Sequence, residues 1–380
     1  MHQENTGTLE SLEDFRHFSE KELEIRFEQL MKQIVPADKT IREQAEKHWG
    51  RVAKPLGSLG VLEEDIVRAA AAQGEKVPDF SKRALLIFCA DNGVVEEGVS
   101  QTGQEVTAAV VSNMTRGRSC SCLMAERAGT DVFPIDMGIA CEVEHQGELH
   151  PLTERKIRRG TSNFTKEAAM TRQEVLTAVL TGIDVVRVLK EQGYRLFAVG
   201  EMGIGNTTTS SAVASVLLQK DPELVTGFGA GLDSAGLKRK IEAIRRGIRL
   251  HHPDPMDGTD VLQKVGGFDL AAMAGAFLGG AIYHVPVVID GVIAAAAAAA
   301  AGRIAEAATD YMLAAHVSAE PASIWLLDLI GVTPAIQAGL RLGEGTGALA
   351  LFPLLDMALS IYRDMDTFAE MEIEEYKPLV

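Results

Sequence analysis

Two patterns of hydrophobic and polar positions divide the chain. Residues 1 to about 50 carry helical periodicity and dense charge, and Pro36 separates two predicted amphipathic helices there. After a glycine-punctuated loop at 54–60 (KPLGSLG), short apolar runs that end in Gly or Asp alternate with helical stretches. The tail from about Phe352 is again helical and acidic. This order predicts an α/β region between two terminal helical segments.

The apolar runs are predicted strands, and the longer stretches between them are predicted helices. The runs are ALLIFCADNG, TDVFPIDMG, RLFAVGEMGIG, VPVVIDG and YMLAAHVS, and helices are expected over 165–192, from Asn206 and after Gly291. This alternation favours a three-layer α/β fold, with a mostly parallel sheet flanked by helices. We expect a catalytic domain over 54–352, and a small helical subdomain formed by segments 1–53 and 353–380. Ligands of such sheets bind beyond the carboxyl ends of the strands.

Composition narrows the class of protein. The 380 residues are 46% hydrophobic and 24% charged, which is typical of a globular chain with a substantial core. The net charge of −16 argues against general affinity for nucleic acid, but not against a small anionic ligand. The N-terminus has no signal pattern, and the alanine run 294–301 is too short to span a bilayer, so no membrane association is expected.

The four cysteines predict neither a disulfide framework nor a metal site. No C-x-x-C pair is present, and so few cysteines in a chain of this length favour the reducing cytoplasm. Cys120 and Cys122 form a C-x-C, which two small thiols near a helix explain better than a metal ligand pair does. The pair His251 and His252 before a proline is interpreted as a surface turn.

The loop GEMGIGNTTTSSAV, residues 200–213, is the first candidate site. Three glycines precede a helix that Asn206, Thr207 and Thr208 begin. A helix N-terminus with free N–H groups and hydroxyls is a natural phosphate cradle. The Lys of a P-loop is absent, and Thr208 stands where G-x-G-x-x-G requires its last glycine. We therefore expect phosphate binding of another kind, the alternative being an N-capped tight turn.

Three further stretches carry polar groups after predicted strands. The segment 90–107 contains several polar side chains before a helix, and 226–244 places glycines ahead of a basic helix. Asp290 ends VVIDG as a single acid, whereas the pyrophosphate motif of many phosphoribosyltransferases needs two adjacent acids. A magnesium–pyrophosphate site is therefore not predicted, although one Asp can bind a ribose hydroxyl. Finally, Glu344 lies between two glycines in RLGEGTGA, where the backbone can bend and a ligand can come close.

Together these strings resemble one enzyme family. KPLGSLG, ADNGVVEEGVS, GEMGIGNTTTSSA, GLD..GL.RKI, GGFDLAAMAGA, DGVIAAAAA and RLGEGTGA occur in this order over roughly 54–352. The set resembles the nicotinate-nucleotide–dimethylbenzimidazole phosphoribosyltransferases, which make the lower-ligand nucleotide of cobamides. The resemblance implies transfer of phosphoribose from nicotinate mononucleotide to a base such as 5,6-dimethylbenzimidazole, giving α-ribazole 5′-phosphate and nicotinate. It also implies a homodimer, and no cofactor or metal, because the donor has one phosphate and no pyrophosphate.

The resemblance also implies roles for individual residues. Glu344 would be the general base, because an acceptor ring loses its N–H proton as its other nitrogen attacks C1′. Burial in an apolar pocket would raise the pKa of this carboxylate and make it a better proton acceptor. Glu201 matches a second acidic position, and Lys240 a basic one near the phosphate or the leaving carboxylate. The other carried-over residues are Gly203, Gly205, Asn206 and Thr207 for the phosphate, Asp290, Gly291 and Ser318 for the nucleotide, and Ser100, Gln101, Gln104 and Leu342 for the base.

The sequence departs from the family pattern at two places, and two other classes of function are considered beside the resemblance. Many relatives have ADHGV where this chain has Asn92, so any role of an imidazole at that position is absent. The family varies around Ser100, and relatives accept purines and in some cases phenols, so the acceptor can also be a purine or a phenol. A dinucleotide-dependent oxidoreductase would need G-x-G-x-x-G after the first strand and an acid about twenty residues later, and neither is found. A non-catalytic nucleotide-binding partner would be marked by loss of the carboxylate at position 344, where Glu344 is present.

Overall fold

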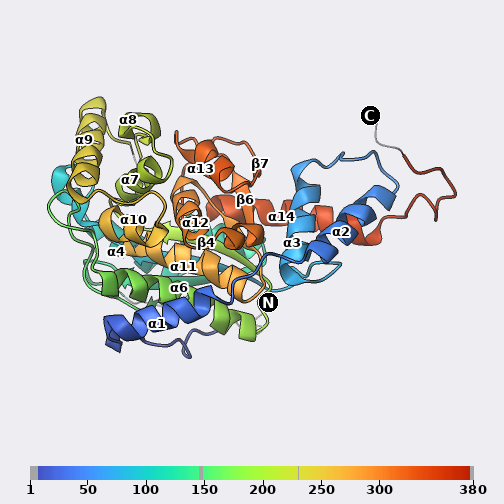
Figure 1. The fold of residues 1–380 in the computed structure, drawn as a ribbon, viewed down its shortest axis with the longest axis horizontal. Coiled ribbons are helices and arrows are strands. Elements are labelled where there is room, and N and C mark those ends of the chain that lie inside the picture. Colours follow the sequence, from blue (N-terminus) through green and yellow to red (C-terminus); the bar gives the residue numbers. More distant parts are fainter. Residues whose placement is uncertain (1–6, 145–148, 230, 377–380) are drawn as a thin grey trace.

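A seven-stranded sheet organises the chain, with the strand order β3-β2-β1-β4-β5-β6-β7 (Figure 1). The computed structural model describes residues 7–144, 149–229 and 231–376. Every pair of neighbouring strands in this sheet is parallel. The strands are β1 Arg83–Ala90, β2 Thr130–Gly138, β3 Thr153–Glu154, β4 Leu196–Met202, β5 Val287–Ile289, β6 Met312–His316 and β7 Pro334–Ile336.

Helices connect the strands and cover both faces of the sheet. Those on one face include α6, α11 and α12, and those on the other include α3, α4, α5 and α14. The α-helices are α1 Glu20–Met31, α2 Lys39–Arg51, α3 Val61–Gln73, α4 Glu105–Thr115, α5 Cys120–Arg127, α6 Arg172–Glu191, α7 Asn206–Leu217, α8 Pro222–Val225, α9 Ser234–His251, α10 Gly258–Val265, α11 Phe268–Ile282, α12 Val292–Ile304, α13 Ser323–Leu329 and α14 Thr346–Asp364, with short 3₁₀ helices η1 Phe15–His17, η2 Gly93–Glu97 and η3 Glu306–Tyr311.

Strand β1 shows why the fold has three layers. Successive side chains of a strand point to opposite faces. Leu86 and Phe88 belong to the core beneath α6 and α11, whereas Leu85 and Ile87 belong to the core beneath α5 and α14. Both sets are fully buried, so the strand is a continuous apolar run, as expected for a parallel sheet covered on both sides. The predicted three-layer α/β class is confirmed.

The connections locate a crevice at the carboxyl edge of the sheet. From β1 the chain moves outward to β2 and β3, then returns to β4 on the other side of β1 and continues to β5, β6 and β7. The strand order therefore reverses between β1 and β4, and ligands of such sheets bind at this kind of switch point.

Helices α2, α3 and α14 form a projection at one end of the molecule, on the right of Figure 1. Trp49 of α2 packs edge-on against Tyr362 of α14, with ring centroids 4.9 Å apart. A β-bridge between Val52 and Thr367 also joins the N-terminal and C-terminal segments. The helical subdomain thus contains residues from both ends of the chain, as the fold class predicted.

The structure differs from the sequence predictions in three respects, one in helix packing and two in where segments begin or end. The first predicted helix, α1, packs against α6 instead of joining the helical projection. The expected division after 352 falls inside α14, which begins at Thr346. The helix predicted from residue 165 begins only at Arg172, because Thr171 and Glu174 form a capping box that starts it there.

Helix α12 confirms that the alanine run is a tightly packed buried helix. Its residues 294–301 are all at most 2% exposed. Alanine side chains allow the neighbouring helix α11 to approach closely. None of the helices in the described ranges combines the length and apolar character needed to cross a membrane.

Candidate active site

A cavity of about 330 Å³ opens beyond the carboxyl ends of β4, β5 and β6. It lies at the carboxyl edge of the sheet beside the switch point between β1 and β4, because Thr102 and Val106, which follow β1, also line it. Four segments supply most of its wall: the end of β4 with the loop to α7, the residues after β5, the residues after β6, and the loop before α14. The predicted site residues in its lining are Glu201, Gly203, Asn206, Thr207, Asp290, Gly291, Ser318 and Leu342.

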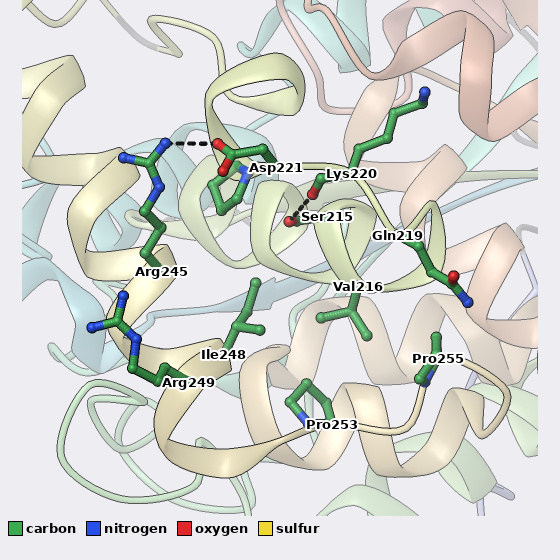
Figure 2. A pocket seen from close by; sticks show the side chains of 11 residues that line it. Ser215, Val216, Gln219, Lys220, Asp221, Arg245, Ile248, Arg249, Pro253 and Pro255 are labelled. Carbon is green, nitrogen blue, oxygen red and sulfur yellow. Dashed lines mark hydrogen bonds and ion pairs between the residues drawn. The ribbon is translucent and has the colours of Figure 1, made fainter.

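A larger hollow of about 490 Å³ lies elsewhere, between α7, α9 and the turn after α9 (Figure 2). Two polar pairs lie in it: Arg245 Nη2 donates to Asp221 Oδ1 at 2.7 Å, and Ser215 Oγ donates to the Lys220 carbonyl at 2.6 Å. The Lys220 side chain points away from it and lies over the Trp325 ring, 4.5 Å from its centroid. Its floor includes Val216, Ile248 and prolines. This hollow offers no group poised for proton transfer, so the cavity at the strand ends is the candidate active site.

The N-terminus of α7 makes one side of the cavity suited to an anion. Gly205 precedes the helix with φ 95° and has no side chain that could cap it. Two of the first N–H groups, those of Asn206 and Thr208, donate to the carbonyls of Gly203 and Gly205. The unpaired N–H groups of a helix N-terminus carry partial positive charge. Helix α12, which also begins at this cavity, is likewise without a side-chain cap among the described residues.

Lys240 of α9 reaches the same side of the cavity. Its Nζ donates to Thr207 Oγ1 at 2.9 Å and to the Gly227 carbonyl at 3.4 Å. The side chain is fully buried, and this burial lowers the pKa of Lys240 to about 8. An anion beside the amine would restore the preference for the charged form.

The loop that carries Glu344 adopts an unusual backbone conformation. Gly343, Glu344 and Gly345 have φ values of 88°, 57° and 77°. A non-glycine residue in this left-handed region is strained, and the surrounding structure must hold it there. Gly200 of β4 makes room for it, because a Cβ at Gly200 would lie 2.5 Å from the Glu344 carbonyl carbon.

Asp290 holds the end of this loop. Its Oδ1 accepts hydrogen bonds from the backbone N–H groups of Gly347 at 2.6 Å and Ala348 at 3.1 Å, and its Oδ2 accepts one from Gly345 at 3.2 Å. The carboxylate thus caps the N-terminus of α14, directly after Glu344. Asp290 was predicted as a nucleotide ligand, and the structure shows its oxygens engaged with this helix.

The Glu344 carboxyl group lies between the strand ends and α5. Its Oε2 accepts a hydrogen bond from Ser121 Oγ at 3.0 Å. Burial raises the pKa of Glu344, and the hydrogen bonds from Ser121 partly counteract that shift. The residue has the properties expected of a general base.

Two other carboxyl groups near the cavity are buried and favour their protonated forms. Burial, together with the nearby Asp269 and Asp290, raises the pKa of Glu201 well above its usual value, although Asn206 Nδ2 donates to Glu201 Oε2. Burial raises the pKa of Asp269 to about 7. Protonation of these groups reduces the negative charge that an anionic ligand would meet.

The predicted base-binding residues of the 90–107 segment lie outside the cavity lining. Thr102 and Val106 line it instead of Ser100, Gln101 and Gln104. Ser100 Oγ accepts from Thr102 N at 3.2 Å, and Gln101 Nε2 donates to the Gly231 carbonyl. The third of these residues, Gln104, donates from its Nε2 to the Asn92 carbonyl at 3.4 Å.

Sequence reasoning missed several groups at this site. His316 lines the cavity with its Nε2 3.8 Å from Asp290 Oδ1, and its place at the end of a predicted strand was an available signal. Ser121 had no such signal, because its helix carries no site residue in the sequence prediction. All four cysteines are free thiols. Within the described ranges, no three His, Cys, Asp or Glu side chains group as metal ligands.

The parallel sheet, with a cavity at its carboxyl edge, places the protein in the class of α/β enzymes that bind small ligands beyond their strand ends. Comparison with known proteins identifies its family. The model of a family described as "Phosphoribosyltransferase" matches residues 34–373. The nicotinate-nucleotide–dimethylbenzimidazole phosphoribosyltransferase of Clostridium acetobutylicum is 43% identical over 355 residues, which are 93% of this chain and 100% of the relative.

Two further comparisons agree. The enzyme of the same name from Escherichia coli is 40% identical over 345 residues, covering 90% of this chain and 95% of the relative. A crystal structure with this name from Thermus thermophilus superposes with a TM-score of 0.82 at 38% identity, covering 89% of this chain and 100% of the other. The chain belongs to the nicotinate-nucleotide–dimethylbenzimidazole phosphoribosyltransferase family.

Proposed function

We propose that the protein transfers the 5-phosphoribosyl group of nicotinate mononucleotide to a nitrogen of 5,6-dimethylbenzimidazole or a related lower-ligand base. The products are α-ribazole 5′-phosphate and nicotinate, and the reaction belongs to cobamide biosynthesis. One acceptor nitrogen forms a bond to C1′, while the bond from C1′ to the pyridine nitrogen breaks. Nicotinate leaves with that electron pair, and the acceptor's N–H proton passes to Glu344.

The observation that carries this proposal is the presence of two complementary features at one edge of the sheet. The N-terminus of α7, with Thr207 and the buried Lys240, forms a cradle for the single phosphate of the donor. The strained loop before α14 places Glu344 at the same strand ends. A mononucleotide anchored at its phosphate would direct its C1′ into the cavity between these features. Holding both reactants in this way removes much of the entropic cost of their encounter.

The first experiment supplies the purified protein with nicotinate mononucleotide and 5,6-dimethylbenzimidazole, without magnesium. Products are followed by chromatography and mass spectrometry, with adenine and phenol as acceptors in parallel reactions. Glu344→Gln keeps the size of the side chain but removes the base, so kcat should fall by roughly 10²- to 10⁴-fold. Glu154→Gln at the far edge strand β3 is a matched control that should retain activity, since it exchanges the same groups away from the cavity.

The expected result is release of nicotinate in equal amount to a base–ribose phosphate, with loss of both products in Glu344→Gln alone. Turnover with adenine or phenol but not with benzimidazole would keep the transfer chemistry and change the acceptor. Binding of the mononucleotide without turnover on any acceptor would contradict the proposal and favour a non-catalytic nucleotide-binding role.

We also assign the protein a homodimeric state and a cytoplasmic location. The homodimeric state is the one that membership of this family implies. The four free thiols suit a reducing compartment. Sedimentation equilibrium should give twice the mass of the chain, and a monomer at micromolar concentration would contradict the assignment.

A further inference from the structure

A short chain of hydroxyl groups leads from the start of α5 to the Glu344 carboxylate. Ser121 Oγ donates to Glu344 Oε2 at 3.0 Å, and Ser119 Oγ lies 2.7 Å from Ser121 Oγ. Both serines are buried, with exposed fractions of 0% for Ser121 and 7% for Ser119. Ser119 is the N-cap of α5 and accepts the Cys122 backbone N–H at 3.2 Å. The two hydroxyl groups are therefore part of the N-terminal turn of α5, and this turn fixes their positions.

The number of hydroxyl protons determines which serine donates each hydrogen bond. A serine hydroxyl donates one hydrogen bond and can accept two. Ser121 donates its proton to Glu344, so the contact between the two hydroxyls requires Ser119 to be the donor. Ser119 also lies 3.1 Å from Cys122 Sγ, but its single proton goes to the closer and stronger acceptor. Each hydroxyl therefore has its proton pointing toward the carboxylate.

We propose that Ser121, oriented by Ser119, is a positioning residue that occupies Oε2 of Glu344 and leaves Oε1 to receive the acceptor's proton. This inference rests on the proposed function, because it assigns Glu344 the role of base. Within the described part of the chain, no other side chain donates a hydrogen bond to this carboxyl group. Ser121 is thus the contact that prevents the carboxylate from turning about its last torsion angle.

The same contact adjusts the basicity of Glu344. The side-chain and backbone groups of Ser121 lower the pKa of Glu344 against the effect of burial. The other ionisable groups that face it are Asp290 after β5 and Glu201 of β4, with the Cys122 thiol on α5. Asp290 raises the pKa of Glu344, so Ser121 is the contact that opposes both burial and a neighbouring charge. Removal of its hydroxyl should raise the pKa of Glu344.

The test compares Ser121→Ala with Ser121→Thr, which restores a hydroxyl, and with Thr115→Val as a control. Thr115 is also buried, and its Oγ1 donates to the Ser112 carbonyl at 2.8 Å near the end of α4, so Thr115→Val removes a hydroxyl bond that does not reach Glu344. For Ser121→Ala we expect kcat to fall about 10- to 100-fold, as for loss of a hydrogen bond to a charged group. The KM for nicotinate mononucleotide should change less than about twofold, and Ser121→Thr should recover most of kcat.

The pH dependence separates positioning from packing. Because loss of the Ser121 hydroxyl raises the pKa of Glu344, the acidic limb of the kcat profile should move to higher pH in Ser121→Ala and remain in place in Thr115→Val. A ¹³C NMR titration of labelled glutamate carboxyl groups, with Glu344→Gln assigning the signal, measures the same shift without turnover.

The outcomes distinguish this inference from the proposed function. An unchanged kcat profile and an unchanged Glu344 titration in Ser121→Ala would overturn it, as would an equal loss in Thr115→Val. A wild-type protein that released no nicotinate would refute the proposed function, whereas the NMR titration would still decide whether Ser121 holds Glu344.

Discussion

Substitution of Asp290 is the most informative perturbation of this site, because it separates two roles. The sequence assigns this residue to the nucleotide pocket, where an acid could bind a ribose hydroxyl. In the structure both carboxylate oxygens accept backbone N–H groups of Gly345, Gly347 and Ala348, at the start of α14. These contacts indicate that Asp290 positions the loop that carries Glu344. Removal of the Asp290 carboxylate should therefore affect stability and kcat more than it affects binding of the donor.

The magnitude follows from three hydrogen bonds to a side chain that is 4% exposed. A hydrogen bond to a charged group contributes about 1.5–3 kcal/mol, and buried N–H groups without a partner add their own cost. These losses are not additive, because Asp290→Ala also removes the cost of burying the charge, so we expect a net loss of about 3–5 kcal/mol. Unfolding of 380 residues has an entropy of about 0.8 kcal/mol/K, which converts this loss to a Tm decrease of about 5 °C.

The assay combines thermal unfolding with steady-state kinetics at varied nicotinate mononucleotide. Asp290→Asn retains one oxygen for the N–H groups and should lose less stability than Asp290→Ala. In both variants kcat should fall at least about tenfold, because Glu344 no longer has a fixed place, while KM changes less. Asp257→Asn is the matched control, since Asp257 caps α10 through the N–H groups of Thr259 and Asp260. That substitution should leave kcat unchanged.

A different result would refute the reasoning. If Asp290→Ala kept the wild-type Tm and kcat but raised KM for the donor tenfold or more, the carboxylate would act on the ribose and not on the loop. The hydrogen bonds to α14 would then contribute little, and the place of Glu344 would depend on other contacts.

Three further substitutions test the electrostatics and packing of the cavity. The pKa of Lys240 is about 8 in the folded protein and near 10.5 when unfolded, so the unfolded chain binds more protons between these values. Urea unfolding should therefore show stability rising from pH 8 to 10 by about 2 kcal/mol more in wild type than in Lys240→Met. The folded-state pKa of Glu201 is raised, so wild type should lose stability relative to Glu201→Gln as pH increases above 4.5, and a constant difference between pH 5 and 8 would contradict this. In Gly200→Ala the new Cβ would collide with the Glu344 backbone, so kcat should fall more than about tenfold, whereas Gly50→Ala, with open space around it, should stay active.

The elements that could be predicted from sequence are those with a strong local pattern. The runs at β1, β2, β4, β5 and β6 are apolar on both faces, because helices cover both sides of the sheet. Strands β3 and β7 have only two and three residues and lie at the sheet edges, so they leave no comparable pattern. The start of α6 could have been predicted better, since Thr171 and Glu174 form a capping box that is visible in the sequence.

The same distinction applies to the site. The loop before α7 and the glycine-flanked segment around Glu344 are local patterns of glycine and polar residues, and they supply ten of the 21 residues that line the cavity. The contact between Ser121 and Glu344 joins residues 223 positions apart. Likewise, the caps that Asp290 provides to α14 span 55 to 58 positions. Such contacts depend on which strand ends meet, so no pattern within either segment could reveal them.

The arrangement of these groups explains why Glu344 lies between two glycines in an otherwise apolar stretch. Buried carboxyl groups such as Glu201 and Asp269 favour their protonated forms, and so they add little repulsion against an anionic donor. Burial also raises the pKa of Glu344, but this side chain is only partly buried, and hydrogen bonds from Ser121 oppose the shift. Environments that separate the pKa values of neighbouring acids also separate their chemical roles. The glycines on either side permit the left-handed turn that brings this one carboxylate to α5, and Asp290 holds the turn in place.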